Sequence, residues 1–103
     1  MQIDILYFEG CPNHAPTVAR VKQIAAEMGL TVPVTEVQIT TSEEAQQRRF
    51  LGSPTVLVNG VDIDPNARQR ASSEFSCRVY PGGAGLPPDD MIRAALQAPH
   101  PPA

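Results

Sequence analysis

Hydrophobic and polar positions along the first part of the chain follow two different periods. Residues 2–8, QIDILYF, are nearly continuous in apolar and β-branched side chains and stop at Gly10, which is typical of a buried strand that ends in a turn. Over residues 17–28 the apolar side chains recur at helical spacing, and Gly29 follows as a stop signal. The pattern therefore predicts a strand over 2–8 and a helix over 17–28.

A second strand and a second helix are expected next. Residues 30–39, LTVPVTEVQI, are rich in β-branched side chains, which favours a strand. Residues 41–51, TSEEAQQRRFL, carry acidic side chains early and basic side chains late. With Ser42 as the N-cap and with Arg48 and Arg49 in the last turn, these charges would complement the dipole of a helix.

The remaining residues predict a hairpin, an insertion and a last helix. Residues 54–64, PTVLVNGVDID, hold an Asn-Gly pair between two apolar runs, the strongest short signal for a β-hairpin. Residues 65–88 show no clear period and are expected to form an irregular insertion. Residues 88–97, PDDMIRAALQ, predict a helix, and the tail 98–103 is expected to be disordered. All expected elements belong to one domain over residues 1–97.

The order of these elements predicts the fold class. A strand–helix–strand unit gives a parallel pair of strands, and the hairpin adds an antiparallel pair. The chain is therefore expected to be an α/β protein with a mixed four-stranded sheet and flanking helices. Its 103 residues are enough for one domain with a modest core and too few for two.

Charge and composition exclude several classes of protein. The net charge is −3 and no basic stripe is present, so we expect no nucleic-acid partner. No apolar run reaches the roughly 18 residues that a membrane span needs, and the first residues lack a leader pattern, so we expect a soluble, cytoplasmic protein without a membrane partner. Two cysteines are too few for a secreted disulfide scaffold, and lone thiols in a reducing compartment are catalytic, metal-binding or simply buried.

Two motifs give the chain a resemblance to the thioredoxin and glutaredoxin superfamily. The first is GCPNH, residues 10–14, a cysteine between the first strand and the first helix; the second is GSPTVLVNG, residues 52–60. The resemblance implies a thioredoxin-like three-layer fold in which Pro54 is a cis-proline that faces the active cysteine. The first motif departs from the family, because Cys-Pro-Asn-His replaces Cys-x-x-Cys. Dithiol chemistry within that motif is therefore excluded.

Cys11 and His14 are the first candidate catalytic residues. A thiol at the N-terminus of a helix faces unpaired N–H groups and the positive end of the dipole, both of which favour the thiolate. His14, three residues later, would share a face with Cys11 and could hold the thiolate by a hydrogen bond or accept its proton. The structural alternatives are a small buried cysteine and an exposed histidine without a role. Pro16 is expected either to distort the first turn or to mark the start of the regular helix.

The resemblance also implies a substrate-binding edge at Ser53, Pro54 and Thr55. A cis bond between Ser53 and Pro54 would turn the chain sharply and expose the backbone groups of Ser53. In the resembled family these groups pair with the backbone of a thiol substrate as an added strand. Thr55 is expected to occupy the strand that follows.

Cys77 lies in the insertion, in SSEFSCRVY, residues 72–80, where the resemblance does not place it. Three interpretations stay open. Cys77 is a core residue of a short extra strand, or it resolves a disulfide with Cys11, or it joins Cys11 in gripping a soft metal ion. A closed structural zinc site is not expected, because such a site takes four ligands.

The sequence therefore predicts a thiol protein that uses Cys11 as a nucleophile in thiol–disulfide exchange. Its partner would be a thiol or disulfide substrate, and no cofactor or resident metal is implied. One alternative is a thiol protein for mercury or copper, or one similar to organomercurial lyase with Cys11, Cys77 and either Asp62 or Asp64. Another is a non-catalytic interaction module. Asp62 and Asp64 alternate on the returning strand, and we expect them on its solvent-facing side.

Overall fold

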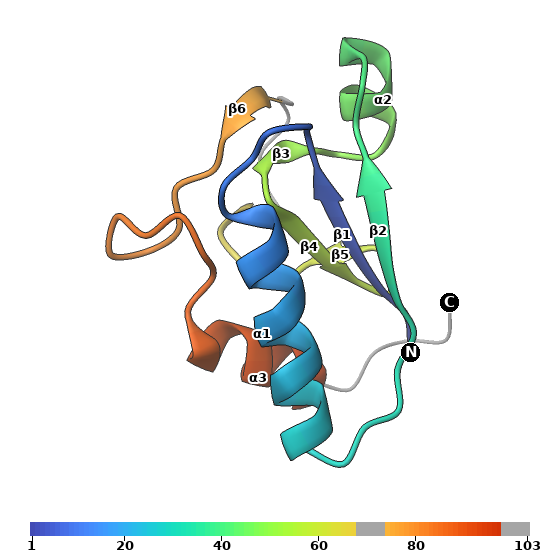
Figure 1. Ribbon diagram of the computed structural model, residues 1–103, viewed down its shortest axis with the longest axis vertical. Helices are drawn as coiled ribbons and strands as arrows, with labels where there is room; N and C mark the ends of the chain where they lie inside the picture. Colours follow the sequence, from blue (N-terminus) through green and yellow to red (C-terminus); the bar gives the residue numbers. More distant parts are fainter. Residues whose placement is uncertain (68–73, 98–103) are drawn as a thin grey trace.

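The computed structural model describes residues 1–67 and 74–97 (Figure 1). Its main sheet has the strand order β2-β1-β4-β5. Strand β1 pairs in parallel with β2 and antiparallel with β4, and β5 returns antiparallel to β4. The strands are β1 (Ile3–Tyr7), β2 (Val34–Gln38), β4 (Thr55–Val58) and β5 (Val61–Asp62). The predicted α/β class and mixed four-stranded sheet are confirmed.

Two helices cover one face of this sheet, and a third contributes one buried residue to the apolar cluster on the other face. Helices α1 (His14–Glu27) and α3 (Asp89–Gln97) lie side by side on one face, and α2 (Ser42–Gln47) lies beyond the end of β2 (Figure 1). Because alternate residues of a strand point to opposite faces, each face has its own apolar cluster. The cluster under α1 and α3 includes Ile3, Ile5, Val56 and Val58; the other includes Leu6, Ala45, Phe50 and Leu57.

Helix α1 begins at His14, ahead of Pro16, whereas the sequence placed its regular part after that proline. Pro16 lies in the first turn of α1, where a backbone N–H has no partner within the helix, so the missing donor costs nothing. The C-terminal end follows the prediction. Gly29 has a φ of 72°, and the next N–H, that of Leu30, donates to the Ala25 carbonyl at 2.9 Å.

The N-cap of α2 is Thr41, so the prediction of Ser42 was wrong by one residue. The Thr41 side chain accepts a hydrogen bond from the Glu44 N–H at 3.1 Å, and the Glu44 carboxylate in turn accepts from the Thr40 N–H at 3.1 Å. This reciprocal arrangement satisfies free donors at the start of the helix.

The predicted last turn of α2 is absent, because the chain leaves the helix early. Arg48 is the C-cap and Arg49 has a positive φ of 56°. The Phe50 N–H then donates back to the Ala45 carbonyl at 2.8 Å, and both side chains are buried in one cluster. Burial of Phe50 thus folds the chain back over the helix end and leaves both arginines outside the helix.

The insertion over 65–88 contains structure that the sequence did not place. Strand β6 (Glu74–Cys77) pairs in parallel with β3 (Leu51–Ser53) and forms a second, two-stranded sheet. An extra strand around Cys77 was one of three open interpretations. Residues 68–73 of the insertion lie outside the described residues. The tail 98–103, which was expected to be disordered, also lies outside them. None of the described helices is long and apolar enough to span a membrane.

Candidate functional site

Cys11 lies in the short connection between β1 and α1. Its N–H donates to the Phe8 carbonyl and its own carbonyl accepts from the His14 N–H, both at 3.3 Å. The residue is 9% exposed. The structure thus places the thiol of Cys11 just before the N-terminus of a helix, in a turn held by two long hydrogen bonds and largely covered by other groups.

The side chain of His14 is directed toward β2. Its ring stacks on that of Tyr7, with centroids 3.5 Å apart and planes 5° apart, and its Nε2 lies 2.7 Å from Glu36 Oε1. Nε2 nevertheless has no hydrogen-bond partner within the described residues, so its contact with Glu36 is a close approach and not a hydrogen bond. Among the described residues no hydrogen bond joins the His14 side chain to Cys11. The sequence did not identify Tyr7 or Glu36, because both depend on the register of β1 against β2.

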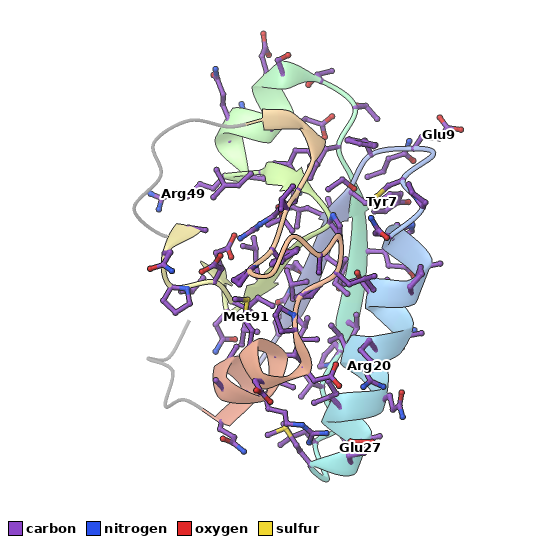
Figure 2. The ribbon with its side chains drawn as sticks, turned by 90° about the vertical axis from the view of Figure 1, so that its left-hand side faces the viewer. Tyr7, Glu9, Arg20, Glu27, Arg49 and Met91 are labelled. Atoms are coloured by element: carbon purple, nitrogen blue, oxygen red, sulfur yellow. The ribbon has the colours of Figure 1, made fainter. Side chains whose placement is uncertain are left out.

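Figure 2 shows where this cluster lies along the helix. Tyr7 and Glu9 lie near the end at which α1 begins, whereas Arg20 and Glu27 lie progressively toward its other end. An open hollow of about 410 Å³ lies beside the connection that carries Cys11. Its lining residues are Phe8, Glu9, Gln38, Ile39 and Thr40. The hollow lies at the carboxyl ends of the parallel strands β1 and β2, the edge at which α/β proteins commonly bind ligands.

Ser53 connects the Cys11 turn to the second sheet. The Phe8 N–H donates to Ser53 Oγ at 3.3 Å, and the Ser53 carbonyl accepts from the Arg78 N–H at 3.0 Å. The peptide bond from Ser53 to Pro54 is cis, the isomer that the resemblance implied. Ser53, Pro54 and Thr55 are all buried. The backbone edge at which a substrate was expected to pair is therefore covered by the chain's own β6 segment.

Cys77 is the last residue of β6, and its backbone is in register with Ser53. The structure brings the backbone of Cys77 to one flank of Ser53 and the turn that carries Cys11 to another. Ser53 of β3 thus lies between the backbone of Cys77 and the turn that carries Cys11, although the two cysteines are 66 positions apart in the sequence.

A buried ion pair anchors the segment after β6. The Arg78 guanidinium binds Asp62 through two hydrogen bonds of 2.7 and 2.9 Å, and the two side chains are 2% and 7% exposed. Asp64 lies 3.9 Å from the same guanidinium and is also buried. The prediction that Asp62 and Asp64 face solvent was therefore wrong. Their alternation on a strand was read as an exposed face, but the cation that they meet comes from the insertion.

Tyr80 completes this cluster. Its ring lies under the Arg78 guanidinium, 4.5 Å from Cζ to the centroid, and its hydroxyl donates to the Pro54 carbonyl at 2.6 Å. Burial raises the pKa of the Tyr80 hydroxyl, although the positive charge of Arg78 opposes the shift. Burial acts to lower the pKa of Arg78, but the hydrogen bond to Asp62 and the surrounding charges raise it. Tyr80 therefore keeps its hydroxyl proton, and Arg78 keeps its positive charge.

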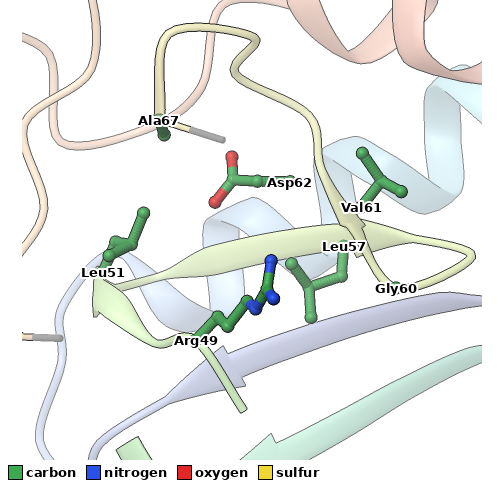
Figure 3. Close-up of a pocket in the computed structure, with 7 residues that line it drawn as sticks. All are labelled: Arg49, Leu51, Leu57, Gly60, Val61, Asp62 and Ala67. Carbon is green, nitrogen blue, oxygen red and sulfur yellow. The ribbon is translucent and has the colours of Figure 1, made fainter. Parts of the chain in front are cut away.

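A cavity of about 130 Å³ lies beside this ion pair. Figure 3 shows the Asp62 carboxylate and the Arg49 side chain among the residues that line it. The other lining residues are Leu51, Leu57, Gly60, Val61 and Ala67. The walls of this cavity are thus apolar apart from the side chains of Arg49 and Asp62.

Comparison with protein-family models, with curated proteins and with solved structures found no match to the chain. Within the two described ranges, no three histidine, cysteine or acidic side chains gather in a way that could hold a metal ion.

Proposed function

We propose that this protein is a thioredoxin-like thiol protein that uses Cys11 as a nucleophile in thiol–disulfide exchange. The observation that carries the proposal is the place of Cys11, between the first strand and the first helix and tied through Phe8 to Ser53, the residue before the cis-proline. The mixed sheet with its flanking helices agrees with the fold that the resemblance implies. Such chemistry suits a reducing compartment, the cytoplasm in our proposal.

The first chemical step uses only the thiolate. Cys11 attacks one sulfur of a disulfide RS–SR′, a bond forms between Cys11 Sγ and RS, and R′S⁻ leaves. The hollow beside Phe8 and Glu9 offers room for the substrate next to the connection that carries the thiol.

His14 can assist this step through only one of its ring nitrogens. Nε2 lies against Glu36 Oε1, 2.7 Å away, so we propose Nδ1 as the acceptor for the thiol proton. This role predicts that His14→Ala slows the reaction of Cys11 with a disulfide at neutral pH, whereas a histidine without a role would leave the rate unchanged.

Mixed-disulfide formation in the Cys77→Ser chain tests the proposal. We expect the folded chain to form one glutathione adduct at Cys11 when it is incubated with glutathione disulfide at neutral pH, detected by intact mass and peptide mapping. The matched Cys11→Ser chain, with Cys77 kept, is the control. A chain that forms the Cys11 adduct only after denaturant is added would overturn the proposal, since the thiol would then be a core residue.

A further inference from the structure

Strand β6 occupies the backbone edge that the resemblance assigns to a substrate. Within β6 and β3, Cys77 is in register with Ser53, and the next N–H of the chain, that of Arg78, donates to the Ser53 carbonyl. We propose that Cys77 is the thiol that resolves the mixed disulfide at Cys11, and that the Arg78–Asp62 pair holds β6 in place for this step. The proposal rests on the function proposed above.

The backbone places Cys77 and the turn that carries Cys11 on two flanks of the same residue, Ser53. Neighbouring strands lie about 4.8 Å apart, which sets the spacing between Cys77 and Ser53. The Ser53 hydroxyl accepts from the Phe8 N–H, and Phe8 in turn holds Cys11. A disulfide needs Cα atoms about 4.4–6.8 Å apart. The backbone of Cys11 is held by two long hydrogen bonds of 3.3 Å, and we infer that its turn moves toward β6 in the resolving step.

The position of β6 is fixed by the residue directly after Cys77. Arg78 is 3% exposed, and a buried guanidinium is tolerated only with its partners in place. Its side chain reaches Asp62 on β5 and Thr55 on β4, so β6 cannot leave β3 without uncovering this charge. Gly52 allows the close approach, because a Cβ there would lie 2.9 Å from Arg78 Cβ. We infer that this anchoring keeps the backbone of Cys77 beside Ser53, on the side of the Cys11 turn.

The resolving step balances as a two-electron exchange. The Cys77 thiolate attacks Cys11 Sγ in the mixed disulfide, the bond between Cys11 and Cys77 forms, and RS⁻ leaves. The substrate disulfide is then fully reduced to two thiols and the protein holds an intramolecular disulfide. A low-molecular-weight thiol or a reduced dithiol protein regenerates the two cysteines. Because β6 covers Ser53, we infer that the substrate is a small disulfide or a disulfide at the tip of a protein loop. A disulfide within an extended strand would need the backbone edge that β6 occupies.

The test uses the full chain and a chromogenic aromatic disulfide in less than stoichiometric amount. We expect the wild-type chain to release both halves of the reagent, the second in a step whose rate does not depend on protein concentration, and peptide mapping to find Cys11 joined to Cys77. The Cys77→Ser chain is expected to release one half and to retain the other on Cys11. A wild-type chain that stops at the Cys11 adduct overturns this inference and leaves the proposed function standing. A folded chain whose Cys11 does not react at all overturns both.

A second variant tests the positioning role of the ion pair. We expect Asp62→Asn to slow the second release at least tenfold while the first release, at Cys11, keeps its rate. The matched control is Glu27→Gln, which removes an exposed ion pair with Arg93 far from β6. Circular dichroism confirms that each chain is folded. Unchanged rates of the second release in folded Asp62→Asn would overturn the role of the pair, and equal slowing of both releases would show a general loss of structure instead.

Discussion

Two regions of the molecule hold arginine–carboxylate pairs, and they use them differently. On the helical face, Arg93 meets Glu27 at 2.8 Å with both side chains more than 40% exposed. Under β6, Arg78 meets Asp62 at a similar distance with both side chains nearly closed to solvent. Water already stabilises the exposed ions, so their pairing adds little, whereas the buried ions depend on each other. The distance is therefore a poor guide to what a pair does, and burial decides it.

The difference also explains the second sheet. Strands β3 and β6 are short, and a two-stranded unit is marginally stable alone. The guanidinium of Arg78, the ring of Tyr80 and the carboxylate of Asp62 join this unit to the main sheet. We infer that the insertion keeps its place through polar anchors, while α1 and α3 keep theirs through the apolar cluster beneath them.

Removing one partner of the buried pair should have the largest effect on stability. We expect Asp62→Asn to lower the free energy of unfolding by about 3–5 kcal/mol, because the buried Arg78 loses its hydrogen-bonded counter-charge and keeps only the more distant Asp64, 3.9 Å away, within the described residues. Replacing both partners, Arg78→Met with Asp62→Leu, should cost less than the single change. Urea unfolding of the three chains measures this. A loss below about 1 kcal/mol in Asp62→Asn would show that the pair is not an anchor.

Gly52→Ala should have the second-largest effect on stability, because it hinders the close packing of the segment after β6 against β3. The added Cβ would lie 2.9 Å from Arg78 Cβ and 3.0 Å from its Cα, and Gly52 has a φ of 114°. We expect a loss of about 2–4 kcal/mol from crowding and backbone strain together. Gly82→Ala is the matched control, since Gly82 has a positive φ but open space around it. Equal losses in the two chains would mean that the approach of β6 to β3 adds nothing.

Tyr80→Phe removes one hydrogen bond and one titrating group from the cluster. We expect a loss of about 1–2 kcal/mol at neutral pH, because the Pro54 carbonyl loses its donor in a buried place.

The same variant predicts a change in pH dependence. Burial raises the pKa of Tyr80 in the folded chain, so above about pH 10 the unfolded state releases this proton while the folded state keeps it. The stability of the wild-type chain is therefore complete below that pH and falls as the pH rises. Tyr80→Phe should show a shallower alkaline decline in denaturant unfolding between pH 9 and 11. Parallel curves for the two chains would contradict the burial of this hydroxyl.

The exposed pair should give the smallest effect. Glu27→Gln is expected to change the free energy of unfolding by no more than about 0.5 kcal/mol, because the ions of Glu27 and Arg93 remain solvated when separated. Unfolding at low and high salt measures the residual Coulomb interaction, which screening should abolish. A loss as large as that of Asp62→Asn would contradict the comparison of the two regions.

The same division separates what the sequence could predict from what it could not. Strand β1, helix α1 and the hairpin of β4 and β5 follow from local periods and from the turn signals at Gly29 and Asn59–Gly60. Strand β6 does not, because its pairing with β3 joins residues far apart in the chain. No local sequence pattern could show that Asp62 and Asp64 meet the buried guanidinium of Arg78.

The candidate site divides in a similar way. The cysteine motif identified the turn that carries Cys11, since its residues are adjacent in the sequence. The neighbours of His14 on β1 and β2 were missed, because Glu36 reaches the ring only through the parallel register of the two strands. Covering of Ser53 by the chain's own β6 was also unforeseen, as the resemblance describes an edge that stays open for a partner.

Disulfide mapping of the native, monomeric chain after mild oxidation tests the central claim most directly. The claim is that Cys11 is a reactive thiol whose partner within the chain is Cys77. We expect an intramolecular disulfide between Cys11 and Cys77 to form readily in the wild-type chain and more slowly in the Asp62→Asn chain. The opposite result would be that Cys11 alone is modified and that Cys77 reacts with thiol reagents only after the protein unfolds. That result would contradict the claim.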